Sequence, residues 1–252
     1  MNQHSLLTTL SATLILLLLL LGLWWFGVNL AHIPSYFLPS IYSVIASLHD
    51  NFVLIFSAAG YTLAEALLGL IIAFITALML ASLAYFIRPL ALILKPLALL
   101  SQALPFMVLS PLIVLWLGFG WSAKLTIVVL SLFFPMFIAN LNGFESIPRL
   151  WLELSFTLEG GSAKPMRRFY YLILPGAYKH MSAGIKIAVA WAMLAAIIAE
   201  WVGGNNGLGF LMQNALSRLD SALLFASLMV LIILSLGLYG LSSAVLRLTH
   251  SD

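Results

Sequence analysis

The residues of this chain that could take part in chemistry are few, and many of them are gathered in one internal stretch. Nine charged residues lie between Glu145 and Lys186, in a chain with only 11 Lys and Arg and 8 Asp and Glu. The stretch also contains the pair Gly160-Gly161 and ends in Leu174-Pro175. Because the flanking segments are almost entirely apolar, we expect this stretch to project into water as a docking surface.

Two carboxylates, Glu65 and Glu200, lie within apolar segments. A charge inside a membrane-spanning helix costs about 2.5–3.5 kcal/mol on insertion scales, so each is a candidate functional residue. Glu65 follows the start of its segment by about two helical turns, and we expect it to act as an interfacial anchor. Glu200 either braces the glycine-rich segment that follows it, by accepting backbone N–H bonds, or contributes to a solute path.

Other polar residues and prolines could line such a path or form its outer gate. Pro105 removes a backbone donor and can break a helix, and broken helices are tolerated in membranes where they line a cavity. Gln102 stands beside it, and Asn205, Asn206 and Gly207 follow Glu200. The alternative for these residues is that they only shape the helix bundle.

The sequence lacks the motifs of the common enzyme classes. It has no cysteine, and its five histidines are not paired at helical spacing, so we expect no metal site and no cofactor. It contains no phosphate-binding motif of the type G-x-x-x-x-G-K-[ST]. The net charge of +3 is too small and too dispersed to indicate nucleic-acid binding. We therefore expect a protein without a catalytic site, in which any ATP is hydrolysed by another subunit.

The composition indicates a helical membrane protein. Of the 252 residues, 63% are hydrophobic and 8% are charged, whereas soluble domains carry about 25% charged residues. The apolar runs are continuous and near the ~20 residues that cross a bilayer. We predict one all-α, polytopic domain over residues 1–252, with a polar loop at about 142–181. The six predicted spans are residues 6–26, 57–86, 96–117, 122–141, 182–201 and 222–246.

The distribution of basic residues predicts the orientation. With both termini in the cytoplasm, nine Lys and Arg residues fall in cytoplasmic segments, and the outer loops hold only Lys124 and Arg218. This bias follows the positive-inside rule and places the polar loop in the cytoplasm. In the outer loops we expect two short helices, at Ser40–His49 and at Phe210–Ser217.

Several segments resemble the inner-membrane permease subunits of bacterial ABC importers, in the nitrate, sulfonate and taurine branch. The resemblance runs from about residue 33 onward. The segments that carry it are Ile33–Ser40, Leu104-Pro105, Pro111–Gly120, Phe133-Phe134-Pro135, Gly143, Ala199–Gly203 and Gly207–Met212. It implies a type I importer fold in the bacterial inner membrane.

The same resemblance assigns a role to the polar loop. In the family this loop begins Glu-Ala-Ala, continues to a glycine and ends in Ile-x-Leu-Pro. Here the matching residues are Glu153, Leu154, Ser155, Gly160, Gly161, Leu174 and Pro175. The first two alanines are replaced by Leu and Ser, and the stretch is about three residues longer. The resemblance implies a coupling helix that docks on an ABC ATPase.

The family's partners would be two ATPase copies, a periplasmic substrate-binding protein and a second permease copy, most simply in a homodimer. Ala190–Ala192, Ala199–Gly203 and Leu224–Ala226 resemble members that take up pyrimidine precursors of thiamine. A sulfonate-like or nitrate-like solute is the alternative. The absence of a buried Lys or Arg at the expected midplane disfavours an anion site there.

Three other classes of protein are alternatives to an importer permease. A stand-alone secondary transporter would need a coupling-ion site near the midplane and inverted repeats, and no repeat is visible in the sequence. A membrane enzyme would need clustered catalytic side chains. A structural subunit of a larger complex is a third alternative, and it is the one that the sequence alone excludes least well.

Overall fold

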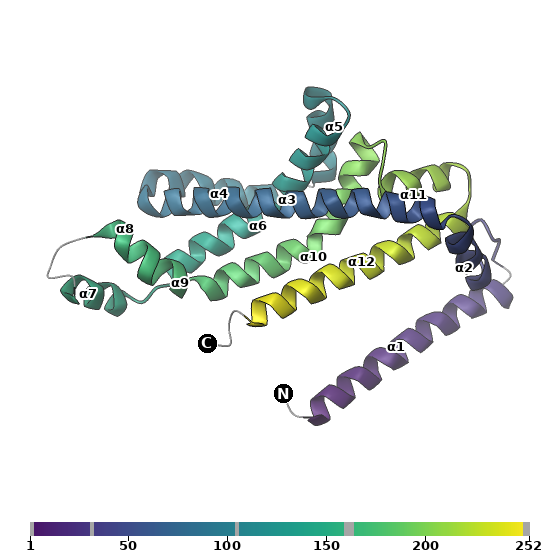
Figure 1. Ribbon diagram of the computed structural model, residues 1–252, viewed down its shortest axis with the longest axis horizontal. Helices are drawn as coiled ribbons and strands as arrows, with labels where there is room; N and C mark the ends of the chain where they lie inside the picture. Colours follow the sequence, from purple (N-terminus) through teal and green to yellow (C-terminus); the bar gives the residue numbers. More distant parts are fainter. Residues whose placement is uncertain (1–2, 31–32, 104–105, 159–163, 249–252) are drawn as a thin grey trace. The chain divides into compact units, whose positions relative to one another are not determined.

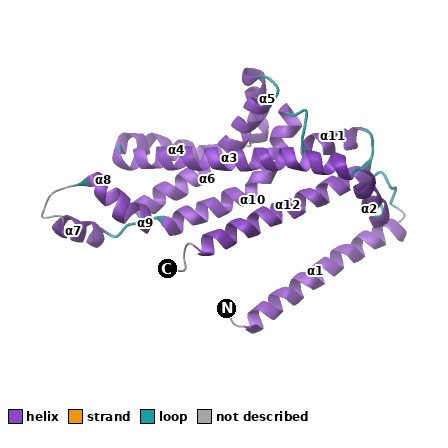
Figure 2. Cartoon of the chain, in the orientation of Figure 1, coloured by secondary structure: helices purple, strands orange, loops and turns teal. Residues whose placement is uncertain are grey.

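The computed structural model describes residues 3–30, 33–103, 106–158 and 164–248, and every regular element in these ranges is a helix (Figure 2). The predicted all-α fold is confirmed over this part of the chain. In order, the helices are α1 (Gln3–Asn29), α2 (Ile41–Asp50), α3 (Phe52–Phe86), α4 (Arg88–Ala103), α5 (Phe106–Leu117), α6 (Trp121–Glu145), α7 (Arg149–Leu158), α8 (Pro165–Arg168), the π-helical η1 (Phe169–Ile173), α9 (Leu174–Gly176), α10 (Tyr178–Gly203), α11 (Leu208–Ser217) and α12 (Ser221–Leu248).

Four of the described helices, α3, α6, α10 and α12, are long and apolar enough to cross a membrane. Two shorter apolar helical stretches are Leu18–Asn29 in α1 and Val108–Leu117 in α5. The predicted third span at 96–117 is divided between α4 and α5. Residues 104–105, between these two helices, lie outside the described part of the structure.

The chain forms two compact units. Unit 1 comprises residues 1–57 and 211–230, and unit 2 comprises residues 58–210 and 231–252. In unit 1, the Trp24 indole N–H donates to the carbonyl of Pro39 at 2.8 Å. Its ring lies 5.3 Å from that of Phe225. The Ser221 hydroxyl donates to the carbonyl of Tyr36. These contacts join α1, the 33–40 connection and the beginning of α12.

The two short helices predicted in the outer loops are present as α2 and α11. Helix α2 begins at a capping serine, where the Ser43 backbone N–H donates to the Ser40 hydroxyl at 3.1 Å. Serine is a preferred N-cap because its hydroxyl satisfies one of the free N–H groups of the first turn.

The core of unit 2 is built on small residues. Helices α6 and α10 pack along their length, and α4 and α5 contact α6 (Figure 1). Alanines fill the buried face of α3 at Ala66, Ala73, Ala77, Ala81 and Ala84, and α10 has a similar series. Small side chains allow close helix approach, which drives packing in lipid where the hydrophobic effect between helices is absent.

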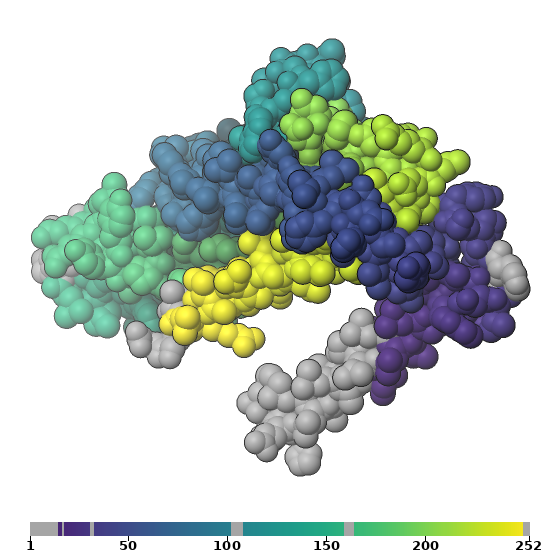
Figure 3. All heavy atoms as spheres, turned by 45° about the vertical axis from the view of Figure 1, so that its right-hand side comes forward, coloured from purple at the N-terminus to yellow at the C-terminus, as the bar shows by residue number. Residues whose placement is uncertain are grey.

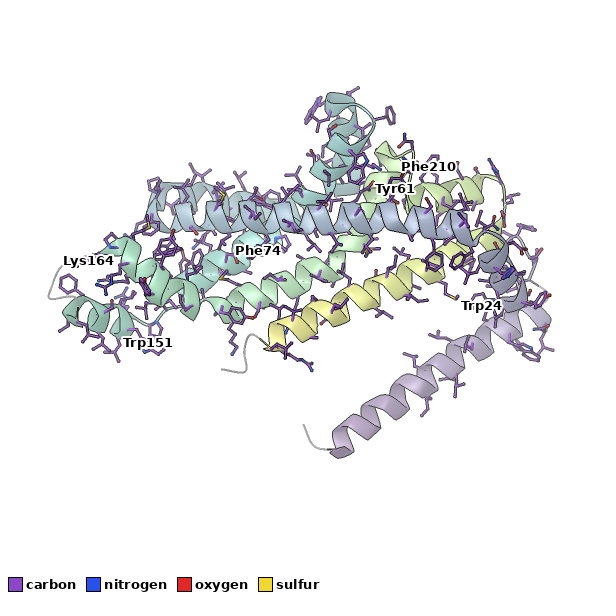
Figure 4. All side chains as sticks on the ribbon, in the orientation of Figure 1. Trp24, Tyr61, Phe74, Trp151, Lys164 and Phe210 are labelled. Carbon is purple, nitrogen blue, oxygen red and sulfur yellow. The ribbon has the colours of Figure 1, made fainter. Side chains whose placement is uncertain are left out.

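The two ends of unit 2 differ in content. Helices α7 and α8 lie at one end, teal-green at the left of Figures 1 and 3, and the α10–α11 connection, in yellow-green, lies at the other. In Figure 4, Trp151 and Lys164 mark the first end, and Tyr61 and Phe210 mark the second. The candidate functional residues fall at these two ends.

Candidate functional site

A cluster of buried polar side chains lies at the α10–α11 end of unit 2. Its members are Thr62 and Glu65 of α3, Lys124 of α6 and Glu200 of α10, each no more than 1% exposed. We call these four residues the polar cluster. Buried polar groups are costly unless they are paired or hydrogen-bonded, so their contacts define what the cluster does.

The Glu200 carboxylate links α10 to α3 and to the beginning of α11. Its Oε2 accepts from the backbone N–H of Gly209 at 2.6 Å, and its Oε1 accepts from the Thr62 hydroxyl at 2.6 Å. The Thr62 hydroxyl oxygen accepts from the backbone N–H of Leu208 at 2.8 Å. A helix N-terminus has free N–H groups and favours negative charge. Glu200 therefore caps α11, as the first of its two expected roles requires.

The turn between α10 and α11 requires glycine at position 207. Gly207 has φ +108°, a conformation that side chains rarely adopt, and a Cβ atom there would collide with the Glu200 carboxylate. Gly209 is also close, since an added Cβ would lie 2.9 Å from Glu200 Oε2. Because glycine has no side chain, the backbone at Gly207 and Gly209 can approach the Glu200 carboxylate this closely.

The second contact of the polar cluster is an ion pair between α6 and α3. The Lys124 ammonium donates to Glu65 Oε1. The ammonium nitrogen also lies 5.4 Å from the centroid of the Trp121 ring. The other carboxylate oxygen, Glu65 Oε2, is buried without a hydrogen-bond partner. A pair of this kind is strongly destabilised when one partner is removed, because the other charge stays buried.

One face of α3 positions both contacts. Thr62 and Glu65 are three residues apart, and side chains at this spacing lie on the same side of a helix. Thr62 contacts the α10–α11 connection, and Glu65 contacts α6. Gly203, one turn after Glu200, packs against α6 as well: an added Cβ would lie 3.9 Å from Lys124 Cγ. The backbone N–H of Gly120 also donates to the Gly203 carbonyl at 3.2 Å.

Two sequence-based interpretations are wrong. Glu65 is not an interfacial anchor, because it is fully buried and paired with Lys124. Lys124 does not belong to an outer loop, because it is inside α6 and 1% exposed. Both errors arise because a salt bridge between helices that are far apart in the sequence produces no local sequence pattern. Thr62 was not among the predicted site residues; its three-residue spacing from Glu65 is the one local signal for its role.

The remaining predicted path residues do not join the cluster. Asn205 and Asn206 are exposed in the α10–α11 connection, whereas their glycine neighbours Gly204 and Gly207 approach Glu200 closely. Pro105 and the side chain of Gln102 lie outside the described part of the structure. Their role as path residues stays a prediction.

The opposite end of unit 2 exposes a short helix. Helix α7 contains the predicted docking residues Glu153, Leu154 and Ser155, and none of its residues is buried. Its exposed apolar side chains are Leu150, Trp151, Leu154, Phe156 and Leu158. Gly160 and Gly161, which follow α7, lie outside the described residues. Exposed apolar groups on a polar segment are typical of an interaction surface.

The return from α7 to α10 is anchored by one aromatic residue. Phe169 of η1 is 4% exposed, and its ring centroid lies 5.1 Å from those of Phe86 and Phe144 and 5.8 Å from that of Tyr85. The predicted loop residues Leu174 and Pro175 form α9, directly before α10. The Arg168 guanidinium lies 6.0 Å from the centroid of the Phe156 ring, which connects α8 to α7.

These two ends define a class of protein. Among the described residues no group of three His, Asp or Glu could hold a metal ion, and the buried charges are used between helices. A bundle of long apolar helices, with buried polar contacts at one end and an exposed short helix at the other, is the architecture of a polytopic membrane protein.

Comparison with known proteins gives the family. The model of the binding-protein-dependent transport system inner membrane component matches residues 67–249. The chain belongs to this family and is a permease subunit of an ABC importer.

Two relatives and one structure illustrate the similarity. A "Probable ABC transporter permease protein" of Haemophilus influenzae is 35% identical, over 87% of this chain and 89% of the relative. The formylaminopyrimidine transport permease protein ThiX of Halalkalibacterium halodurans is 30% identical, over 87% and 86%. An inward-facing structure of the MetNI methionine ABC transporter has the same fold, with TM-score 0.66, 18% identity and coverage of 79% and 97%.

Proposed function

We propose that two copies of this chain form the translocation pathway of an importer, in which two ATPase subunits hydrolyse ATP and a periplasmic binding protein delivers a small solute. The observation that carries the proposal is the contrast, in a member of this family, between a buried polar cluster and an exposed helix α7. One end keeps helices together, and the other offers a surface to a partner in water.

Helix α7 is the proposed coupling helix. It carries Glu153, Leu154 and Ser155, which match the start of the family's coupling motif, and it exposes apolar side chains that α6 and α10 do not cover. A docked ATPase would bury these side chains. When the two ATPases close on ATP, they would move the paired α7 helices. The closed ATPase pair would bind one packing of the helix bundle more tightly than the other and so shift the equilibrium between the two packings.

The polar cluster is the proposed brace of the outer gate. It connects α3, α6, α10 and the start of α11 through the Glu200 and Lys124 contacts. Any movement that separates these helices must break charged hydrogen bonds, each worth about 1.5–3 kcal/mol. The cluster therefore favours one packing of this end until the partners supply the energy to change it.

The orientation of the chain follows from the same assignment. With α7 in the cytoplasm, both termini are cytoplasmic and the polar cluster faces the periplasm. The buried position of Lys124 supports this orientation, because it leaves Arg218 as the one Lys or Arg of the outer loops, against nine in cytoplasmic segments.

The proposed solute is a neutral pyrimidine related to thiamine precursors. Similarity to ThiX over most of both chains supports this choice. The buried charges support it as well: among the described residues Lys124 is the one buried Lys or Arg, and Glu65 already neutralises it. A sulfonate or nitrate would need a cation that is not already paired. The alternative is a sulfonate-like or nitrate-like solute, held by groups other than Lys124.

The first experiment isolates the tagged full chain from its native membranes in mild detergent and identifies the proteins that accompany it by mass spectrometry. We expect an ABC ATPase subunit. Glu153→Lys should reduce its recovery at least tenfold, and Asp50→Lys is the matched charge reversal on α2, which should leave recovery unchanged. Isolation of the chain alone, with ion-driven transport in vesicles without ATP, would replace the proposal with a secondary transporter.

The second experiment tests the solute with the complete complex in vesicles. ATP-dependent uptake of labelled formylaminopyrimidine is measured with unlabelled pyrimidine or taurine as competitor. Competition by the pyrimidine alone supports the proposed solute. Uptake of taurine, with no uptake of the pyrimidine, would assign the chain to the sulfonate alternative while leaving its role as permease intact.

A further inference from the structure

A surface groove lies at the α7–α9 end of unit 2, between the C-terminal half of α3 and the segment from α8 to α9. Its volume is about 390 Å³. The residues that form its walls are Leu78, Met79 and Leu83 of α3 and Met166, Tyr170 and Leu174 of the α8–α9 segment. Met79, Met166 and Tyr170 are more than half exposed, so the rest of the described chain leaves the groove open.

The floor of the groove is aromatic. Phe169 lies at its base and is buried among the rings of Tyr85, Phe86 and Phe144. It belongs to the π-helical turn η1, a geometry that is rare and is frequent at functional sites. In this turn the backbone N–H of Leu174 donates to the carbonyl of Phe169, and Met166 and Tyr170 of the same segment form part of the groove wall.

Exposed cations follow the apolar walls at one end. On the α8 side, the exposed residues Lys164 and Arg167 flank Met166, which forms part of the groove wall. On the α3 side, Arg88 stands two residues after Phe86, whose ring packs on Phe169. The groove therefore combines an apolar channel, an aromatic side chain at its border and a group of cations next to it.

We infer that this groove binds an anionic phospholipid, with an acyl chain along the apolar walls and its phosphate against Lys164 and Arg167. Basic pockets on the cytoplasmic side of membrane helices bind acidic head groups, and each Lys or Arg near the surface contributes about 1 kcal/mol. Tyrosine is enriched at the membrane–water boundary, where Tyr170 would lie. The inference depends on the membrane location of the chain and is independent of ATPase coupling.

The test measures lipid binding to the purified full chain by native mass spectrometry, with phosphatidylglycerol and phosphatidylcholine as probes. The wild-type chain should retain phosphatidylglycerol preferentially. The double variant Lys164→Gln/Arg167→Gln removes two exposed charges and should weaken phosphatidylglycerol binding roughly 30-fold, about fivefold for each charge. The matched control Lys179→Gln/Arg247→Gln removes two exposed charges elsewhere and should change it less than twofold.

A second variant tests the apolar part. Met79→Trp replaces an exposed wall residue with a larger one, so it should fill the groove without loss of stability and should reduce retention of either lipid. Soluble glycerol phosphate should not compete with phosphatidylglycerol, because it lacks the acyl chain. Equal binding of both lipids to the wild type and all variants would overturn the inference. Conversion of a dimer to a monomer by Met79→Trp would overturn it too, by assigning the groove to a second copy of the chain.

Discussion

The two ends of unit 2 use their charged residues in opposite ways. At the α10–α11 end, Glu65, Lys124 and Glu200 are buried and their contacts are made with other helices of the same chain. At the α7–α9 end, Glu153, Lys164 and Arg167 are exposed, next to apolar side chains that are also exposed. The first arrangement stabilises the chain itself, whereas the second is available to something else.

This difference separates stability from assembly. A substitution in the polar cluster removes a partner from a group that water cannot reach, so it should change the folding of the bundle and the balance between its packings. A substitution on α7 changes a surface that contributes little to the isolated chain. The two ends should therefore respond to mutation in different experiments.

The largest effect is expected at the buried ion pair. Lys124→Met leaves the Glu65 carboxylate buried without its cation and should destabilise the chain by about 3–5 kcal/mol. Glu65→Gln/Lys124→Met removes both charges and should recover most of that loss. Thermal unfolding in detergent, followed by Trp fluorescence, measures both. Equal destabilisation by the single and double variants would contradict the role of the pair as a compensated charge.

A smaller effect is expected where the backbone approaches Glu200. Gly207→Ala must adopt φ +108° and also place a Cβ against the carboxylate, which should destabilise the chain by about 1–3 kcal/mol. Gly60→Ala on α3 is the control, because a Cβ there meets nothing within 4 Å; alanine favours a helix over glycine, so this variant should be neutral or stabilising. The same unfolding measurement applies, and similar behaviour of the two variants would argue against a tight α10–α11 turn.

Substitution of Glu200 separates its charge from its hydrogen bonds. Glu200→Ala removes both acceptors and should destabilise by about 1.5–3 kcal/mol. Glu200→Gln can still accept from the Gly209 N–H and can donate to the Thr62 hydroxyl, whose own proton then turns to the Ala58 carbonyl, 3.2 Å away. We expect Glu200→Gln to retain at least half of the stability that Glu200→Ala loses. Equal losses would show that the negative charge at the α11 N-terminus dominates.

The smallest effect on stability is expected on α7. Leu154→Asp replaces a side chain that is 57% exposed and should change the free energy of unfolding by no more than about 0.5 kcal/mol. In the complex, however, it should abolish most ATP-driven uptake, because it places a charge in the proposed ATPase interface. Unfolding and vesicle uptake are compared in parallel. Normal uptake would contradict the proposed ATPase interface on α7. A large loss of stability would show that Leu154 contributes to the fold of the chain.

Much of the fold could be predicted from composition and local pattern. The apolar runs predict helices where α3, α6, α10 and α12 are found. The short helices α2 and α11 lie where the sequence predicts short helices, at Ser40–His49 and Phe210–Ser217. Local signals suffice here because helix formation in lipid satisfies each backbone group within its own segment.

The candidate site was only partly predictable. The position of Glu200 before a glycine-rich loop indicated a brace, and the structure gives it that geometry with Gly209. The role of Glu65 was not predictable, because its partner Lys124 is 59 residues away. A lysine near the end of an apolar run has the same sequence pattern whether it turns to water or into the bundle.

By itself, the sequence determined that this is an all-helical membrane protein, that its family resemblance is to importer permeases, and that its charge is concentrated between α6 and α10. Only the tertiary structure decided which charges are buried and paired, that Thr62 joins Glu200 to the α11 N-terminus, and that a groove opens beside η1. The physical reason is range: hydrophobicity and helix signals act within one segment, whereas ion pairs, caps between helices and grooves depend on how segments pack.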